Sequence, residues 1–320
     1  MAPVAKPLVR IVTPGTREKN DGNWRTAARW SEMLRDRFRV ILQTAWSGEP
    51  ADALIALHAR RSAESIRAFR DRNPHGRIAL VLTGTDLYGD LPGNKEAVRS
   101  LDIADRVIVL QEDALDHLRA AWRKKSAVIY QSATPLRPAS KAKGRLDCVA
   151  VGHLREEKDP ETLFRALSLL PSSLPIRVRH IGAALDPRLA KLARSTAKHD
   201  PRYRWFGPLA HGLTRIAIRN AHVLVHPSRL EGGANVIAEA LASGSTVIAS
   251  RMSGNVGMLG RDYPGFFPVG EPAELADRLA QALDPAYLRE LTRACRKRAP
   301  LFRPEHEARQ LGRILSSLLA

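Results

Sequence analysis

Two glutamates and the glycines between them form the segment of this sequence best suited to chemistry. Glu231 and Glu239 are separated by seven residues, and Gly232 and Gly233 directly follow the first of them. A glycine pair at the entry to a helix lets the backbone approach a ligand closely, and the N–H groups of a helix start favour an anion. Two carboxylates beside that anion site can accept hydrogen bonds from sugar hydroxyls of the same ligand. On spacing alone, a solvated loop glutamate followed by a surface glutamate is an equally good interpretation.

The sequence around these glutamates is more specific. Residues 223–250, followed by Met252, Ser253, Gly254 and Asn255, resemble the donor-site signature of the retaining glycosyltransferases of family four, a class with two Rossmann-like domains. The resemblance implies that Glu231 contacts the donor sugar and that Glu239 holds the ribose hydroxyls. The other implied donor-binding residues are Gly232, Gly233, Ala234, Asn235, Gly254 and Asn255.

A second segment, about eighty residues upstream, agrees with the first. Residues 148–171 resemble the strand, loop and helix in which this family clamps the donor diphosphate with an arginine and a lysine. Lys158 falls on the clamp lysine, but the arginine position is His153, and a neutral imidazole is a weaker phosphate partner than a guanidinium. Arg155, two residues further on, is the candidate to supply the missing charge. The resemblance thus implies catalytic roles for Lys158 and Glu231 and places His153 in the donor site, and we add Arg155 as a catalytic candidate because it can supply the missing charge.

Residues 9–30 occupy the place of the family's glycine-rich first loop. They contain no GxGxxG, so a dinucleotide-binding interpretation is weak. The glycines offer turns, and the cations suit an anionic acceptor, although solvated loop cations are an equal alternative. The acceptor-binding candidates in this loop are Gly15, Arg17, Lys19, Gly22, Asn23 and Arg25.

The segment LTGTDLYGD, residues 82–90, departs from the family pattern. Many relatives have His-Gly-Thr-Asp here, and that histidine lies beside the acceptor, whereas this chain has Thr83. A catalytic base is less necessary when the nucleophile arrives already ionised, as a thiolate, phosphate or selenophosphate does. We therefore count Thr83, Thr85 and Asp86 as acceptor-binding candidates. The alternatives are a plain strand-end role for Thr83 and a turn-capping role for Asp86.

The compact length and the runs TPGTREKNDGNWRTAARW, LTGTDLY and VGHLREEKDP resemble a narrower branch, the selenosugar synthases of selenoneine biosynthesis. That resemblance implies transfer of a sugar from a UDP-sugar, typically UDP-N-acetylglucosamine, to selenophosphate, which forms a carbon–selenium bond. One alternative is a family-four glycosyltransferase with a thiol, sugar or lipid acceptor, and another is a UDP-sugar epimerase. A non-catalytic protein that binds nucleotide sugars or nucleic acid is the alternative of another class. We expect no cofactor besides the UDP-sugar co-substrate, and no metal, because no Asp-x-Asp site is evident.

The sequence gives weaker support for a functional role of three further residues. His226 and Arg229 come just before Glu231, so they either line the pocket or serve the structure. His180 ends a predicted strand, where a packed histidine is expected more often than a catalytic one.

The pattern of apolar runs predicts the elements that position these residues. Short apolar runs alternate with segments of helical period, as in a strand at 53–57, a helix at 63–72 and a strand at 78–82. Such alternation indicates parallel sheets covered on both faces. We therefore predict an α/β protein of two Rossmann-like domains facing a central cleft, the glycosyltransferase B-type architecture. Ligands of such sheets bind at the carboxyl ends of the strands.

The predicted boundaries follow from a break in this rhythm. Residues 134–144 are rich in proline and basic residues. We expect an N-terminal acceptor domain at 1–135, a linker at 136–146 and a donor domain at 147–300. Residues 301–320 are expected to form a C-terminal helix that packs back on the N-terminal domain. A single helix is also predicted at 113–122.

Composition narrows the class of protein. The chain has 51 Lys and Arg against 33 Asp and Glu, a net charge of +18, which attracts anions. The basic residues are spread out, so we expect small anionic substrates rather than specific nucleic-acid binding, and we predict no oligomeric state. No apolar run approaches the ~20 residues of a membrane-spanning helix, and no secretory signal is evident, so no stable membrane insertion is expected. Cys148 and Cys295 lack metal-ligand spacing and fit a reducing, cytoplasmic compartment.

Overall fold

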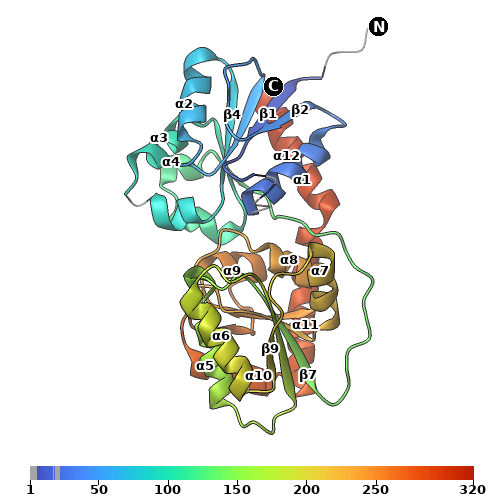
Figure 1. Ribbon diagram of the computed structural model, residues 1–320. Helices are drawn as coiled ribbons and strands as arrows, with labels where there is room; N and C mark the ends of the chain where they lie inside the picture. The colour runs from blue at the N-terminus through green and yellow to red at the C-terminus, as the bar shows by residue number, and fades with distance from the viewer. Residues whose placement is uncertain (1–5, 17, 19–21, 92) are drawn as a thin grey trace. The chain divides into compact units, whose positions relative to one another are not determined.

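The computed structural model describes residues 6–16, 18, 22–91 and 93–320, which form two compact units (Figure 1). The N-terminal unit comprises the described residues up to Gln131 together with Pro304–Ala320, and the C-terminal unit comprises Ser132–Arg303. Arg17 and Lys19, two of the acceptor-binding candidates, lie outside the described residues. Each unit is built on one parallel sheet, as the alternation of strands and helices predicts.

The described residues of the N-terminal unit contain a six-stranded parallel sheet in the order β2-β1-β3-β4-β5-β6. Its strands are β1 (Leu8–Val12), β2 (Arg39–Gln43), β3 (Ala53–Leu57), β4 (Arg77–Leu82), β5 (Arg106–Val109) and β6 (Ser126–Val128). Its α-helices are α1 (Gly22–Leu34), α2 (Ala63–Arg72), α3 (Lys95–Ile103), α4 (Ala120–Arg123) and α12 (Pro304–Leu319). A π-helical turn (Asp86–Asp90) and a 3-10 helix (Glu112–His117) complete it.

Apolar residues of this sheet are buried on both faces. All five residues of β3 are buried, as expected for a central parallel strand. On one face the core includes apolar residues of α1 and α12, and on the other it includes residues of α2 and α3 (Figure 1). The C-terminal helix is fixed to α1 by Glu307, whose buried carboxylate accepts hydrogen bonds from Trp30 Nε1 at 2.6 Å and from Arg29 Nε at 3.0 Å.

The C-terminal unit repeats this plan, with a six-stranded parallel sheet in the order β12-β11-β10-β7-β8-β9. Its strands are β7 (Leu146–Val151), β8 (Ile176–Ile181), β9 (Tyr203–Trp205), β10 (Val223–His226), β11 (Thr246–Ser250) and β12 (Phe266–Phe267). Its α-helices are α5 (Pro160–Leu169), α6 (Pro187–His199), α7 (His211–Asn220), α8 (Asn235–Ala242), α9 (Ser253–Leu259), α10 (Pro272–Gln281) and α11 (Pro285–Arg298). Helices α5, α6 and α10 lie on one side of the sheet, and α7, α8 and α11 lie on the other (Figure 1).

The segment expected as a linker is irregular but is anchored to the C-terminal unit. Lys141 Nζ donates hydrogen bonds to the carbonyl oxygens of Arg219 and Ala221 and to Ser245 Oγ, at 2.6, 2.5 and 3.1 Å. Burial, and then the charge of Arg219, lowers the pKa of Lys141 to about 8. An amine so placed binds the carbonyl groups at the C-terminus of α7, which a helix leaves without partners.

The single helix predicted at 113–122 is wrong. The chain instead forms the 3-10 helix Glu112–His117 and the short helix α4, with Leu118 and Arg119 extended between them. Arg123 donates a hydrogen bond to the Leu118 carbonyl at 3.1 Å, and Arg119 lies over the ring of Trp122 at 4.8 Å. These local contacts stabilise the break in place of continued helical hydrogen bonds.

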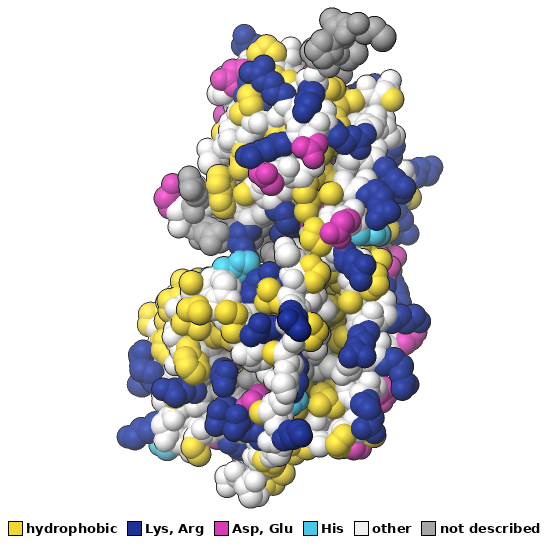
Figure 2. All heavy atoms as spheres, turned by 90° about the vertical axis from the view of Figure 1, so that its right-hand side faces the viewer, with side chains coloured by type: hydrophobic (Ala, Val, Ile, Leu, Met, Phe, Trp, Pro, Cys, Tyr) yellow, Lys and Arg dark blue, Asp and Glu magenta, His cyan; other side chains and the backbone are white. Residues whose placement is uncertain are grey.

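Basic side chains are scattered over the surface. On the face shown in Figure 2, Lys and Arg side chains occur on both units without forming one continuous tract. Among the described residues, no helix is long and apolar enough to cross a membrane.

Candidate functional site

The loops that carry the donor-site candidates leave one edge of the C-terminal sheet. Strands β11, β10, β7 and β8 are neighbours in that order and all run parallel, so the loops at their carboxyl ends meet. The loop after β7 carries His153, Arg155 and Lys158, and the loop after β10 carries Glu231. This is the edge at which open α/β sheets bind ligands.

Lys158 and Glu231, which are 73 residues apart in sequence, form an ion pair at this edge. Their side chains are 18% and 13% exposed, so a ligand can still reach them. Burial acts to raise the pKa of Glu231, but the Lys158 ammonium and the neighbouring His226 outweigh it and hold the pKa well below its usual value. Glu231 is therefore a carboxylate at neutral pH, with a lysine as its counter-ion.

His226 lies behind this pair at the end of β10. Its Nε2 is 3.5 Å from Glu231 Oε1, and it is buried. Burial lowers the pKa of His226, and it outweighs the raising effect of the hydrogen bond and charge of Glu231, while Lys158 lowers the pKa further. The ring is thus a neutral wall of the site, and a small hollow between the loops is lined in part by Gly152, Lys158 and His226.

Glu239 is held on the other side of the β10 loop, in α8. Its carboxylate is 2.7 Å from His211 Nε2, at the start of α7. The Glu239 side chain is buried, whereas that of His211 is half exposed. His211 could not be identified from the sequence, because a contact across 28 residues leaves no spacing signal.

Two glycines let the loops approach one another. A Cβ on Gly254 would lie 2.1 Å from the Glu231 carbonyl oxygen, and one on Gly182 would lie 1.9 Å from that of Gly152. Only a residue without a side chain fits at either position. The Gly152 carbonyl also accepts a hydrogen bond from His180 Nε2 at 3.2 Å, so its loop is held from two directions.

His180 is packed, as expected from its place at the end of a strand. Its Nδ1 accepts a hydrogen bond from the Tyr203 hydroxyl at 2.9 Å, while its Nε2–H is donated to Gly152. Burial lowers the pKa of His180 to about 4, so the ring is neutral at pH 7. This neutral imidazole joins β7, β8 and β9.

The diphosphate-clamp candidates differ in how firmly they are held. His153 Nδ1 accepts a hydrogen bond from the Ala183 N–H at 3.0 Å, which leaves the proton of the neutral ring on Nε2. Burial, and then the charges of Arg155 and Lys158, lowers the pKa of His153. Arg155 is exposed, and its Nε is 3.8 Å from Glu157 Oε2. His153 is thus a fixed neutral donor, and Arg155 is a charge with a weak partner.

Arg229 and Asn255 have partners within the protein. Arg229 Nε pairs with Asp159 Oδ2 at 3.0 Å, which ties the loop after β10 to the start of α5. Asn255 is fully buried and donates to the Ser250 carbonyl oxygen at 2.9 Å. Its side chain fixes the turn between β11 and α9, next to Gly254. Asn235, at the start of α8, is half-buried, and so is Gly233; Gly232 and Ala234 are buried.

In the N-terminal unit, the first-loop candidates lie around the end of β1. Gly15 is buried, and its N–H is 3.4 Å from Thr13 Oγ1. Gly22 is exposed at the start of α1, and the next two candidates, Asn23 and Arg25, are half-buried in its first turns.

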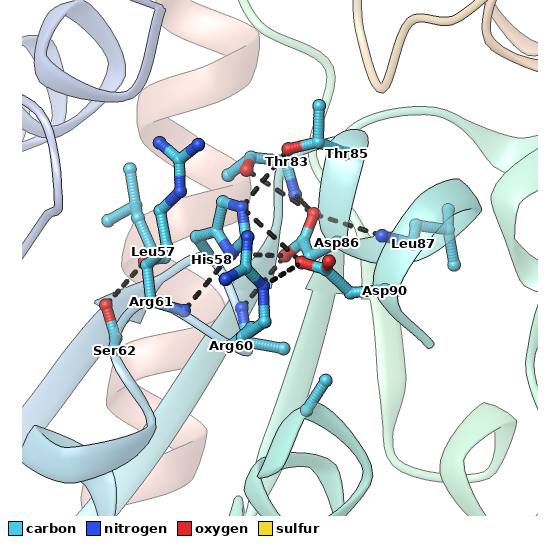
Figure 3. Close-up of polar contacts among 12 residues, drawn as sticks. Leu57, His58, Arg60, Arg61, Ser62, Thr83, Thr85, Asp86, Leu87 and Asp90 are labelled. Carbon is cyan, nitrogen blue, oxygen red and sulfur yellow. Dashed lines mark hydrogen bonds and ion pairs between the residues drawn. The ribbon is translucent and has the colours of Figure 1, made fainter. Parts of the chain in front are cut away.

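Thr83, Thr85 and Asp86 lie at the end of β4 (Figure 3). The Asp86 carboxylate is fully buried and accepts hydrogen bonds from four backbone N–H groups at 2.8–3.1 Å, those of Ala59, Thr83, Gly84 and Leu87. Asp86 therefore organises the turn, which is the alternative that the sequence left open. Thr83 is half-buried and Thr85 is exposed.

His58 is a member of this cluster that the sequence analysis missed. It follows β3 directly, and its Nε2 is 3.1 Å from Thr85 Oγ1. A polar residue after a wholly apolar strand was the available signal. Among the described residues, no group of three or more His, Cys, Asp or Glu side chains is arranged to hold a metal ion.

Comparisons with known proteins agree with this architecture. A family model described as glycosyl transferases group 1 matches residues 135–301. The fold is similar to a sucrose-phosphate synthase from Thermosynechococcus elongatus, with a TM-score of 0.77, 19% identity, and coverage of 98% of this chain and 99% of that one. It is also similar to HepE from Anabaena in complex with UDP, with a TM-score of 0.72, 16% identity, and coverage of 98% and 100%. A glycosyltransferase from Rickettsia africae gives a TM-score of 0.73 at 14% identity, with 99% of each chain covered. No curated protein matches this sequence.

Proposed function

This chain belongs to the family of glycosyl transferases group 1, and we propose that it transfers a sugar from UDP-N-acetylglucosamine to selenophosphate. The observation that carries the proposal is the ion pair between Lys158 and Glu231 at the carboxyl edge of the C-terminal sheet. It joins the two segments that resemble the family's donor site. The Anabaena neighbour crystallised with UDP supports the same choice of nucleotide.

In the proposed reaction, the C-terminal unit holds the donor. Glu239 accepts hydrogen bonds from the ribose hydroxyls, and Glu231 orients the sugar. Lys158 and Arg155 offset the charge that develops on the departing diphosphate, with His153 as a neutral donor. Stabilisation of developing charge by fixed groups is usually the largest catalytic contribution.

The acceptor supplies the nucleophile. A selenium lone pair forms a bond to the anomeric carbon as the bond from that carbon to the diphosphate oxygen breaks, and the electron pair leaves on UDP. Because selenophosphate is already ionised, the step does not need a base at position 83, where this chain has threonine. A neutral sugar hydroxyl would need one.

The test measures UDP release and product mass with UDP-N-acetylglucosamine and selenophosphate, a thiol, a sugar or buffer alone. The expected result is UDP release with selenophosphate only, together with a selenium-bearing sugar. Glu239→Ala should weaken UDP-sugar binding, whereas Glu161→Gln, which changes a half-buried carboxylate on α5 paired with Arg188, should not.

The possible results separate the levels of the proposal. Turnover with another acceptor would preserve the donor site and remove selenophosphate. No turnover with any acceptor, together with unchanged UDP-sugar binding by Glu239→Ala, would contradict both the donor-site assignment and the transferase reaction.

A further inference from the structure

His58 adopts a backbone conformation that residues other than glycine rarely take. Its φ is 73°, and Asp159 is the other non-glycine residue with positive φ among those described. Such a conformation costs about 1–3 kcal/mol, and strain of this kind concentrates at functional sites. With this backbone conformation, the imidazole, which is 1% exposed, points towards the end of β4 (Figure 3).

The contacts of His58 determine which ring nitrogen carries the proton. The Arg61 backbone N–H donates to Nδ1 at 3.4 Å, so Nδ1 is unprotonated. Burial lowers the pKa of His58, and Arg61 and Arg60 lower it further, against the raising effect of Asp86 and Asp90. The ring is therefore neutral, and its Nε2–H donates to Thr85 Oγ1 at 3.1 Å.

This arrangement fixes what Thr85 can offer to a ligand. A hydroxyl whose oxygen already accepts a hydrogen bond has its own proton left to donate. Among the described residues, no group accepts that proton, and Thr85 is exposed. The hydroxyl is thus a donor directed away from His58.

Arg61 adds a charge on the same side. Its guanidinium is exposed, makes no ion pair or hydrogen bond with the part of the chain that the structure describes, and points to the same side of the cluster as the Thr83 and Thr85 side chains (Figure 3). The neighbouring Arg60 differs, because its Nε pairs with Asp90 Oδ2 at 2.9 Å. The buried carboxylate of Asp86 is occupied by backbone N–H groups.

We propose that Arg61 and Thr85 form an oxyanion-binding site at the carboxyl ends of β3 and β4, with His58 as the positioning residue that aims the Thr85 hydroxyl. The site takes a phosphate-type group. Resting on the proposed function, it would hold the phosphate of the anionic acceptor. A guanidinium and an outward hydroxyl both donate hydrogen bonds, so they suit oxygen atoms that carry negative charge. The neutral Nε2–H cannot remove a proton through Thr85, so the site does not activate a neutral alcohol.

The first experiment measures binding of inorganic phosphate to the full chain by titration calorimetry, so that it does not depend on turnover. Arg61→Gln and Thr85→Val should each raise the dissociation constant about tenfold, the effect of losing one strong hydrogen bond. Thr85→Ser, which keeps the hydroxyl, should bind like the original protein. The matched control is Arg67→Gln, which removes a charge from α2 that lies 3.9 Å from Glu96 and should leave binding unchanged.

A second measurement tests the positioning role of His58. His58→Asn, a residue that tolerates positive φ, should weaken phosphate binding in the original protein and add nothing in the Thr85→Val background. This coupling is absent if His58 serves only the fold, because its effect would then be the same in both backgrounds.

UDP binding by the same variants separates this inference from the proposed function. All of them should bind UDP like the original protein. Weaker phosphate binding by Arg61→Gln and Thr85→Val, without turnover of selenophosphate, would support the oxyanion site and overturn the acceptor assignment. Equal phosphate affinity in Arg61→Gln, Thr85→Val and Arg67→Gln would overturn the site. If a nucleic-acid chain bound more tightly than inorganic phosphate and lost the same affinity in Arg61→Gln, the assignment of a small-molecule ligand would be overturned.

Discussion

Acid should weaken the C-terminal unit through His180. The folded protein keeps this imidazole neutral, with Nδ1 accepting from the Tyr203 hydroxyl and Nε2–H donated to the Gly152 carbonyl. Burial lowers its pKa from 6.5 to about 4. Because Gly152 precedes the His153 loop, protonation of His180 also disturbs the proposed diphosphate site.

The sign and size of this effect follow from the two pKa values. As the pH falls below 6.5, His180 takes up a proton in the unfolded chain but not in the folded one until about pH 4. The free energy of unfolding therefore decreases as the pH falls through this interval, and His180 does not change it above the interval. At 1.36 kcal/mol per unit, the complete loss is about 3.4 kcal/mol, of which about 2.5 kcal/mol has occurred at pH 4.5.

The assay compares urea unfolding of the original protein and of His180→Gln at pH 7.5 and pH 4.5, followed by circular dichroism. Glutamine can donate to Gly152 but does not titrate, so the variant should be less stable by about 1–2 kcal/mol at pH 7.5. At pH 4.5 this difference should shrink or reverse, because the original protein alone has lost about 2.5 kcal/mol through position 180.

Differences between variants are needed because burial also lowers the pKa of His58, His153, His222 and His226. The control is His199→Gln, which changes an exposed histidine at the end of α6; a charged imidazole is favoured at a helix C-terminus, so this difference should not shrink as the pH falls. If the difference for His180→Gln does not shrink either, the assignment of acid sensitivity to His180 is refuted.

Three more predictions concern single contacts. Lys158→Met should lower kcat about 100-fold or more, because a fixed charge facing the leaving diphosphate is lost. Steady-state UDP release measures kcat, with Lys158→Arg as the control, and a loss of less than about threefold in Lys158→Met would contradict the prediction. Gly254→Ala should weaken UDP-sugar binding in calorimetry, because its Cβ would lie 2.1 Å from the Glu231 carbonyl oxygen; unchanged affinity would show that the loop moves freely. Glu307→Gln should reduce the free energy of unfolding by about 2 kcal/mol, since its buried charge accepts a 2.6 Å hydrogen bond from Trp30. Denaturation followed by tryptophan fluorescence measures this, with Glu305→Gln as the control, and equal unfolding midpoints for the two variants would refute the prediction.

The helices and strands that the sequence predicted best are those with sharp boundaries. The bounds of β3 and α2 are confirmed to the residue, because apolar runs end at polar or turn-forming residues there. Helix α11 (Pro285–Arg298), which is strongly basic, was not predicted from the sequence. Its buried side chains are Leu291 and Cys295, one turn apart, and so narrow an apolar stripe gives a weak periodic signal.

The residues of the candidate site also divide into those that the sequence indicates and those that it does not. Motif resemblance alone identified Lys158 and Glu231 as candidates, and the structure brings them into contact. Contacts between residues far apart in sequence could not be predicted in this way. His211 reaches Glu239 across 28 residues, and the position of His58 depends on the register of β3 against β4 and on a positive φ. Neither feature changes the hydrophobic period of the sequence.

The pairing of Lys158 with Glu231 also bears on why His153 can replace the arginine usual in the clamp. The charge of Lys158 is already offset by its own carboxylate before any ligand binds. On the proposed function, Arg155, which is exposed and has a weak partner, adds a second positive charge to that of Lys158 at this edge. A second guanidinium is not the only way to bind a phosphate oxygen, since an oriented neutral N–H also donates. The Ala183 N–H leaves the His153 proton on Nε2, so position 153 supplies a fixed donor while Arg155 supplies the charge.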